Sequence, residues 1–138
     1  IIIFFQIIMG AFVSGLDAGL LHQTWPLMGN NFFPDDIVLI DLKNLLNFND
    51  HSLVQFYHRN LAYLVSVYII LFSIYIFRKN IINLYKPLKI LIIALVLQIL
   101  LGILTLLSGL NIYLASAHQI TSVVLVFSSI NLYYHHIK

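Results

Sequence analysis

Four long apolar stretches cover most of this chain, and they leave few folds open to it. They are residues 1–16, 53–77, 88–107 and 112–134. A helix crosses about 30 Å of hydrocarbon with about 20 residues, whereas membrane strands are shorter and alternate in polarity. The sequence therefore predicts an all-α integral membrane protein, a four-transmembrane-helix bundle forming a single domain over residues 1–138. The first stretch is short and starts at Ile1 without a Met, so we expect a fragment that begins inside its first helix.

Composition supports lipid as the solvent and excludes several classes of site. The chain is 61% hydrophobic and 9% charged, whereas soluble domains carry about 25% charged residues. The absence of cysteine excludes disulfides, thiolate metal sites and iron–sulfur clusters. Nucleic-acid binding is not expected, because four of the seven basic residues flank one short connection and form no wider patch. These four are Arg78, Lys79, Lys86 and Lys89.

The charges of the connections predict how the bundle is oriented. Residues 78–89 are basic with no acidic residue, which is typical of a cytoplasmic loop. All five Asp residues lie in the connection 17–52. We therefore expect this acidic loop and the short loop 108–111 to face outward, with the C-terminus inside. The expected location is a bacterial inner membrane, or the mitochondrial inner membrane for a eukaryotic chain.

Two histidines, His58 and His118, lie at matched depth inside two of the predicted spans. His58 is five residues past Leu53 and His118 is six past Ile112, and both spans run from outside to inside. An ionisable side chain in hydrocarbon is costly without a partner and marks a functional candidate. Two imidazoles at one depth are suited to holding a single metal-centred cofactor between them.

Three roles compete for this histidine pair. Each ring can be a core histidine satisfied by a hydroxyl, an amide or a backbone carbonyl. A proton relay is less favoured, because such relays usually recruit carboxylates and the spans contain neither Asp nor Glu. The third role is bis-histidine ligation of haem iron between facing helices, with an apolar slot and a polar edge for the propionates.

Several other polar residues have two interpretations each. Arg59 either extends to the headgroups or neutralises a propionate. Gln55 and Gln119 either hydrogen-bond the imidazoles from a second layer or bond nearby backbone. The remaining histidines are expected to be solvated or interfacial. They are His22, His51, His135 and His136.

The long connection 17–52 is predicted to contain a short interfacial helix in its second half. Asp35 and Asp36 suit the N-terminal end of such a helix, and apolar residues follow at helical spacing. The apolar residues are Val38, Leu39, Leu42, Leu45 and Leu46. The helix would form a lid over the outer end of the bundle, and an inert connector is the alternative.

A short internal repeat precedes each of the two helices that carry a span histidine. Gln6-x-x-x-Gly10 recurs as Gln98-x-x-x-Gly102, and a Ser-Gly-Leu follows each copy at 14–16 and 108–110. Glycines at helix contacts allow close approach or leave room for a flat ligand. The repeat predicts two similar helix pairs and pseudo-symmetric placement of the two histidines.

Five motifs, in this order along nearly the whole chain, give it a family resemblance. Together they resemble the C-terminal half of the membrane haem A synthases. The motifs are VSGLDAG at 13–19, WPLMG at 25–29, LVQFYHRNLAY at 53–63, LGILTLL at 101–107 and LASAHQ at 114–119.

This resemblance implies a fold, a cofactor and a reaction. That family is an eight-helix duplicated protein whose halves each carry a histidine pair, and it oxidises a methyl group of haem O to the formyl of haem A. The family's N-terminal, substrate-binding half typically carries a Glu where this chain has Gln55. The resemblance therefore implies that His58 and His118 are the axial iron ligands of a haem b in the C-terminal half.

The resemblance also implies partners, and one alternative stays open. The expected partners are the lipid bilayer, the N-terminal half of the same enzyme, haem O and haem A, with haem O synthase or a second copy as further contacts. This half alone is expected to lack the substrate-oxidising site. The alternative function is a stand-alone b-type cytochrome or anchor subunit of a respiratory complex.

Overall fold

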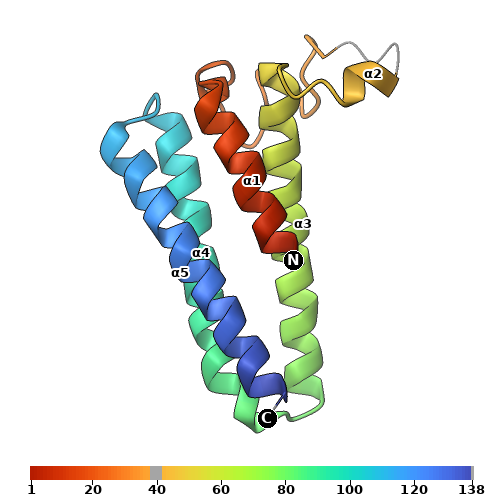
Figure 1. Cartoon of the computed structure of the whole chain (residues 1–138), viewed down its shortest axis with the longest axis vertical. Coiled ribbons are helices and arrows are strands. Elements are labelled where there is room, and N and C mark those ends of the chain that lie inside the picture. The colour runs from red at the N-terminus through yellow and green to blue at the C-terminus, as the bar shows by residue number, and fades with distance from the viewer. Residues whose placement is uncertain (38–41, 138) are drawn as a thin grey trace.

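The computed structural model describes residues 1–37 and 42–137, and this part of the chain is helical apart from loops and one isolated bridge between Met28 and Asn31. The predicted all-α class is confirmed. In Figure 1 the longer helices form a tall bundle, and a short helix lies beside its upper end. The helices are α1 (Ile2–Gly15), η1 (Ala18–Leu20), α2 (Leu42–Leu45), α3 (His51–Arg78), η2 (Ile82–Leu84), α4 (Tyr85–Leu107) and α5 (Ile112–Ile137).

Within residues 1–37 and 42–137, three helical segments are long and apolar enough to cross a membrane. They are His51–Arg78, Ile82–Leu107 and Ile112–Ile137. Helix α1 has 14 residues, a rise of about 21 Å at 1.5 Å per residue, and is too short to span by itself. Figure 1 shows its N-terminus about halfway along α3, so α1 covers only one half of the bundle.

The four long helices associate as two pairs. Helix α4 packs mainly on α5 and helix α1 mainly on α3, with looser contacts between the pairs. Each pair contains one helix with the Gln-x-x-x-Gly motif and one with a span histidine. This is the arrangement predicted from the internal repeat.

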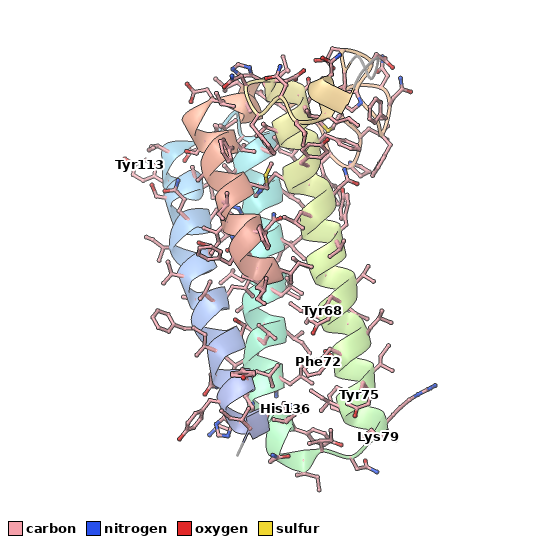
Figure 2. All side chains as sticks on the ribbon, turned by 45° about the vertical axis from the view of Figure 1, so that its right-hand side comes forward. Tyr68, Phe72, Tyr75, Lys79, Tyr113 and His136 are labelled. Atoms are coloured by element: carbon pink, nitrogen blue, oxygen red, sulfur yellow. The ribbon has the colours of Figure 1, made fainter. Side chains whose placement is uncertain are left out.

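The loops divide between the two ends of the bundle as their charges predict. In the acidic connection, residues 16–37 and 46–50 lie at the same end of the bundle as the loop 108–111, here called the outer end (Figure 1). The basic connection after Arg78 and the C-terminus lie at the other, inner end. Figure 2 shows Tyr113 near the outer end of α5, with His136 and Lys79 near the inner end.

Side-chain caps fix where the two histidine-bearing helices begin. The Asp50 carboxylate accepts a hydrogen bond from the backbone N–H of Leu53 at 3.0 Å, at the start of α3. The Asn111 side-chain oxygen accepts from the N–H of Tyr113 at 3.0 Å, at the start of α5. Such caps satisfy N–H groups that the first helical turn leaves without partners.

The apolar core fills the inner half of the bundle, where α3, α4 and α5 meet. Its side chains are nearly all fully buried, whereas most other large apolar side chains are exposed on the outside, as lipid requires. The core residues are Val65, Ile69, Ile76, Leu84, Leu88, Leu91, Ala94, Leu95, Leu125 and Leu132. The outer half, where α1 joins the other three helices, contains a cavity instead.

The predicted interfacial helix is only partly found. Helix α2 is four residues long and ends at Leu45, and the Tyr57 hydroxyl donates to the Leu45 carbonyl at 2.9 Å. Asp35 and Asp36 do not begin it: Asp35 accepts from the Asn31 amide at 2.8 Å, and Asp36 accepts from Ser52. Both carboxylates are used for loop contacts instead. The predicted positions 38–41 lie outside the described residues.

Candidate functional site

A cavity of about 500 Å³ opens between α1, α3, α4 and α5 in the outer half of the bundle. Its walls are mainly apolar, with some polar groups among them. Cofactor pockets typically have 300–1,000 Å³ and this kind of lining. His58 of α3 and His118 of α5 both line it, each about two turns from the outer end of its helix. The structure therefore brings the two predicted site residues to one cavity.

Each imidazole packs against the glycine of the neighbouring helix in its pair. A Cβ atom added to Gly102 would lie 2.9 Å from Cε1 of His118, and one added to Gly10 would lie 3.2 Å from Cε1 of His58. Both distances are shorter than ordinary van der Waals contact. Glycine is therefore what allows each ring to lie flat against the adjacent helix.

The glutamine of each motif contacts the same imidazole as its glycine. The Gln6 amide nitrogen lies 3.2 Å from Nδ1 of His58, and the Gln98 amide nitrogen lies 3.4 Å from Nε2 of His118. In addition, Nδ1 of His118 lies 3.1 Å from the backbone carbonyl oxygen of Gln98. These contacts with Gln6 and Gln98 were not predicted, although the internal repeat contained the signal for them.

Gln55 and Gln119, the glutamines singled out from the sequence, line the cavity without contacting an imidazole in this way. The Gln55 amide donates to the His22 backbone carbonyl at 2.9 Å, which is the second of its two predicted roles. Its side-chain oxygen and that of Gln6 are buried without a hydrogen-bond partner. Two buried acceptors at the wall of a cavity are a mark of a site shaped for something polar.

Arg59 turns to the outer loop and binds it through backbone carbonyls. Its guanidinium donates to the carbonyl of His22 at 2.7 Å, of Thr24 at 2.8 Å and of Leu27 at 3.1 Å. Neither predicted role of Arg59 included these contacts. The side chain also lines the cavity, so it joins the loop to the cavity's outer edge.

His22 was expected to be solvated or interfacial. In the structure it belongs to a polar cluster at the outer end. Its Nε2 lies 2.9 Å from the Ser52 hydroxyl and 3.4 Å from Asp36, and Ser52 also donates to Asp36. Partial burial raises the pKa of the Asp36 carboxyl, but its hydrogen bond with Ser52, its backbone hydrogen bond and the neighbouring His22 outweigh burial and hold that pKa below its ordinary value. The cluster fastens the loop to the start of α3.

The other histidines lie away from the cavity, as predicted. His51 and His136 are exposed and His135 is half-buried, at the two ends of the bundle. Among the described residues, no group of three or more His, Asp or Glu side chains is arranged to hold a metal ion. The histidines that line the cavity are His58 and His118.

Known proteins resemble this chain over most of its length. Residues 1–130 match the family model COX15-CtaA, described as cytochrome oxidase assembly protein. A protein of Pelagibacter ubique named "Heme A synthase" is 44% identical over 93% of this chain and 37% of its own length. Proteins of the same name from Wolbachia pipientis wMel and Rickettsia felis are 38% and 40% identical, over 94% and 91% of this chain.

The match covers only a part of each relative. The chain spans 35% of the Wolbachia protein and 37% of the Rickettsia protein, so it is equivalent to little more than a third of them. No solved structure is significantly similar to it.

Proposed function

Because the chain belongs to the COX15-CtaA family of cytochrome oxidase assembly proteins, we propose that it is the haem b-binding, C-terminal half of a haem A synthase. In this proposal it supports oxidation of the haem O methyl group to the formyl of haem A by electron transfer. The substrate-oxidising site belongs to the N-terminal half, which this chain does not supply. The bilayer around it is the inner, or cell, membrane of a bacterium, as the bacterial relatives suggest.

The observation that carries the proposal is the placement of His58 and His118 on the wall of one cavity. The residues present fit a haem in three respects. The cavity has a mainly apolar lining, Gly10 and Gly102 let each imidazole lie close against the neighbouring helix, and Arg59 supplies a polar group at the outer edge. Bis-imidazole ligation between helices of a bundle is a well-attested way to hold such a group.

Each of these residues has a distinct part in the proposed site. His58 and His118 would be the axial ligands, and Arg59 and Gln55 would face the propionate edge. A bound haem b supplies reversible one-electron transfer. The apolar side chains of α1 and α4 exclude water from the rings, which favours the neutral imidazoles that iron requires.

The proposed partners follow from the same assignment. The N-terminal half of the enzyme would bind haem O and release haem A, and electrons would pass between the two halves. A further contact with haem O synthase, or with a second copy of the chain, would serve transfer of the substrate through the membrane. Gln55 stands where the substrate-binding half carries a Glu, which supports the cofactor role for this half.

Spectroscopy of ligand variants tests the proposal. The purified chain, reconstituted with haem b, is expected to show the absorption bands of a six-coordinate, low-spin haem. His58→Ala and His118→Ala should each abolish that spectrum, because one imidazole leaves iron five-coordinate. His136→Ala, at the inner end (Figure 2), is the matched control and should leave it unchanged. An unaltered spectrum in both ligand variants would refute the assignment.

A further inference from the structure

The groups beside each histidine indicate which ring nitrogen is free to bind a ligand. We propose that Gln6 is a positioning residue for His58, and that the two imidazoles are held unequally. The tautomer of His118 is fixed by a backbone carbonyl, whereas that of His58 depends on the Gln6 side chain alone. This inference deepens the proposed function and rests on it.

The tautomer of His118 follows from a contact that permits only one assignment. Its Nδ1 lies 3.1 Å from the backbone carbonyl oxygen of Gln98, which can only accept a hydrogen bond. Nδ1 therefore carries the proton and Nε2 carries the lone pair. A hydrogen bond from Nδ1–H to a carbonyl is the usual way in which proteins orient a metal-binding imidazole.

The Gln98 side chain agrees with this assignment. Its oxygen accepts a hydrogen bond from the Thr121 hydroxyl, so its amide nitrogen is the atom that faces Nε2 of His118, at 3.4 Å. An N–H donor that faces Nε2 requires a lone pair on Nε2. The contact between Nδ1 and the Gln98 carbonyl leads to the same assignment. The polar groups around His118 thus agree on a ring ready to bind iron through Nε2.

His58 has a different environment. Gln6 donates to the His58 backbone carbonyl at 3.1 Å, which fixes the nitrogen end of its amide toward the histidine. The same nitrogen lies 3.2 Å from Nδ1 and 3.5 Å from Nε2 of the ring. Nδ1 is the nearer of the two, so the proposal assigns it the hydrogen bond from Gln6. The proton of the neutral ring would then be on Nε2, the atom that iron would need.

One unsatisfied atom shows how the second ligand would become available. The Gln6 side-chain oxygen is buried without a partner. Ligation through Nε2 would leave the ring proton on Nδ1, and a turn of the Gln6 amide would let this oxygen accept it. The turn would exchange the hydrogen bond from Gln6 to the His58 carbonyl for one that gives the buried oxygen a partner. Occupancy of the site is therefore coupled to the orientation of Gln6.

Nitrogen NMR of the cofactor-free chain tests the tautomers directly. With ¹⁵N-histidine in lipid nanodiscs at pH 8, His118 should be protonated at Nδ1 and His58 at Nε2, with signals assigned from the two alanine variants. Gln98→Leu should leave the His118 tautomer unchanged, because the backbone carbonyl remains. Gln6→Leu should turn His58 into a mixture of tautomers. Persistence of one tautomer for His58 in Gln6→Leu, or its loss for His118 in Gln98→Leu, would overturn the inference.

Haem titration measures the consequence for ligation. Gln6→Leu should weaken haem b affinity by about 10-fold, the lower end of the range for lost outer-layer partners, while Gln98→Leu binds nearly as the wild type does. Both variants should keep the six-coordinate spectrum. Equal losses in the two variants would contradict the unequal roles. Gln6→Ala repeats the comparison should the Leu variant fail to fold.

The two arms separate this inference from the proposed function. A wild-type chain that binds no haem b refutes the proposed function. The NMR experiment still decides whether Gln6 sets the tautomer of His58. A wild type that binds haem b, with identical behaviour of Gln6→Leu and Gln98→Leu in both arms, refutes the inference alone.

Discussion

At the scale of single residues, the absence of a side chain at two glycines is as important to the site as the histidines themselves. Each imidazole lies against a glycine whose Cβ would come within 3.2 Å or less of the ring. Gly15, at the end of α1, has no atom within 4 Å of the corresponding position. A methyl group would therefore displace an imidazole at Gly10 and Gly102, but nothing at Gly15.

We predict that Gly102→Ala shifts the His118 ring out of its present position. The new Cβ would lie 2.9 Å from Cε1, a separation that real Cβ atoms do not tolerate, so the ring must rotate or move. The change is expected to alter the His118 signals in nitrogen NMR and to weaken haem b binding. Gly15→Ala is the matched control and should change neither, since alanine is also the better helix former. Unchanged His118 signals in Gly102→Ala would contradict the packing described.

The residues of the site were only partly predictable from sequence. His58 and His118 stood out because a lone histidine is conspicuous in an apolar span. Gln6 and Gln98 were visible only as a repeat. A single sequence does not show that a glutamine on one helix faces a histidine on another helix, 52 or 20 positions away. The loop contacts of Arg59 could not be predicted for a related reason: its partners are backbone carbonyls of a loop, and these carry no sequence signal.

At the scale of the helices, the position of the first turn of α3 determines where the side chains of that helix lie along the bundle. It begins at His51 behind the Asp50 cap and continues to Arg78. The start of the helix determines the depth of His58, because each residue adds 1.5 Å along the axis. The cap therefore contributes both to stability and to the depth of His58 in the bundle.

We predict that Asp50→Ala lowers the stability of the chain by about 1 kcal/mol, the usual cost of a lost N-cap. The free energy of unfolding in mixed micelles on addition of SDS measures the change. Asn49→Ala, at an exposed neighbouring position, is the control and should have little effect. A loss in Asn49→Ala as large as in Asp50→Ala would show that the carboxylate is not the cap.

Helix existence was well predicted, whereas helix ends were not. The four apolar stretches became α1, α3, α4 and α5, but α3 starts before Leu53, α4 starts before Leu88 and α5 continues past Tyr134. Polar residues at those ends, such as His51, Lys86 and His135, are helical although they reach the interface. Hydropathy marks where lipid begins, and helices extend beyond that boundary because their backbone hydrogen bonds remain favourable in water.

At the scale of the whole molecule, the charges of the loops and the placement of the loops agree on one orientation. The acidic connection and the loop 108–111 share the outer end, and the basic connection and C-terminus share the inner end (Figure 1). Positive charge is retained on the cytoplasmic side during insertion. The outer end, with the cavity close beneath it, is therefore expected to face away from the cytoplasm.

Cysteine labelling tests this orientation with no background, because the chain has no cysteine of its own. Asn30→Cys places a thiol in the outer connection, and Lys79→Cys places one in the basic connection (Figure 2). A membrane-impermeant maleimide is expected to modify position 30 in right-side-out vesicles and position 79 only in inside-out vesicles. Modification of both thiols from the same side would contradict the topology.

The looseness between the two helix pairs bears on how the molecule is assembled. Each pair is formed by consecutive helices, so each can fold in the bilayer as an independent unit before the two meet. One imidazole comes from each unit, and a ligand that binds both imidazoles stabilises only the docked state, in proportion to its concentration over its dissociation constant. On the proposed function, haem binding therefore joins two helix pairs that have already formed. Maturation of the protein is then complete only when haem has been inserted.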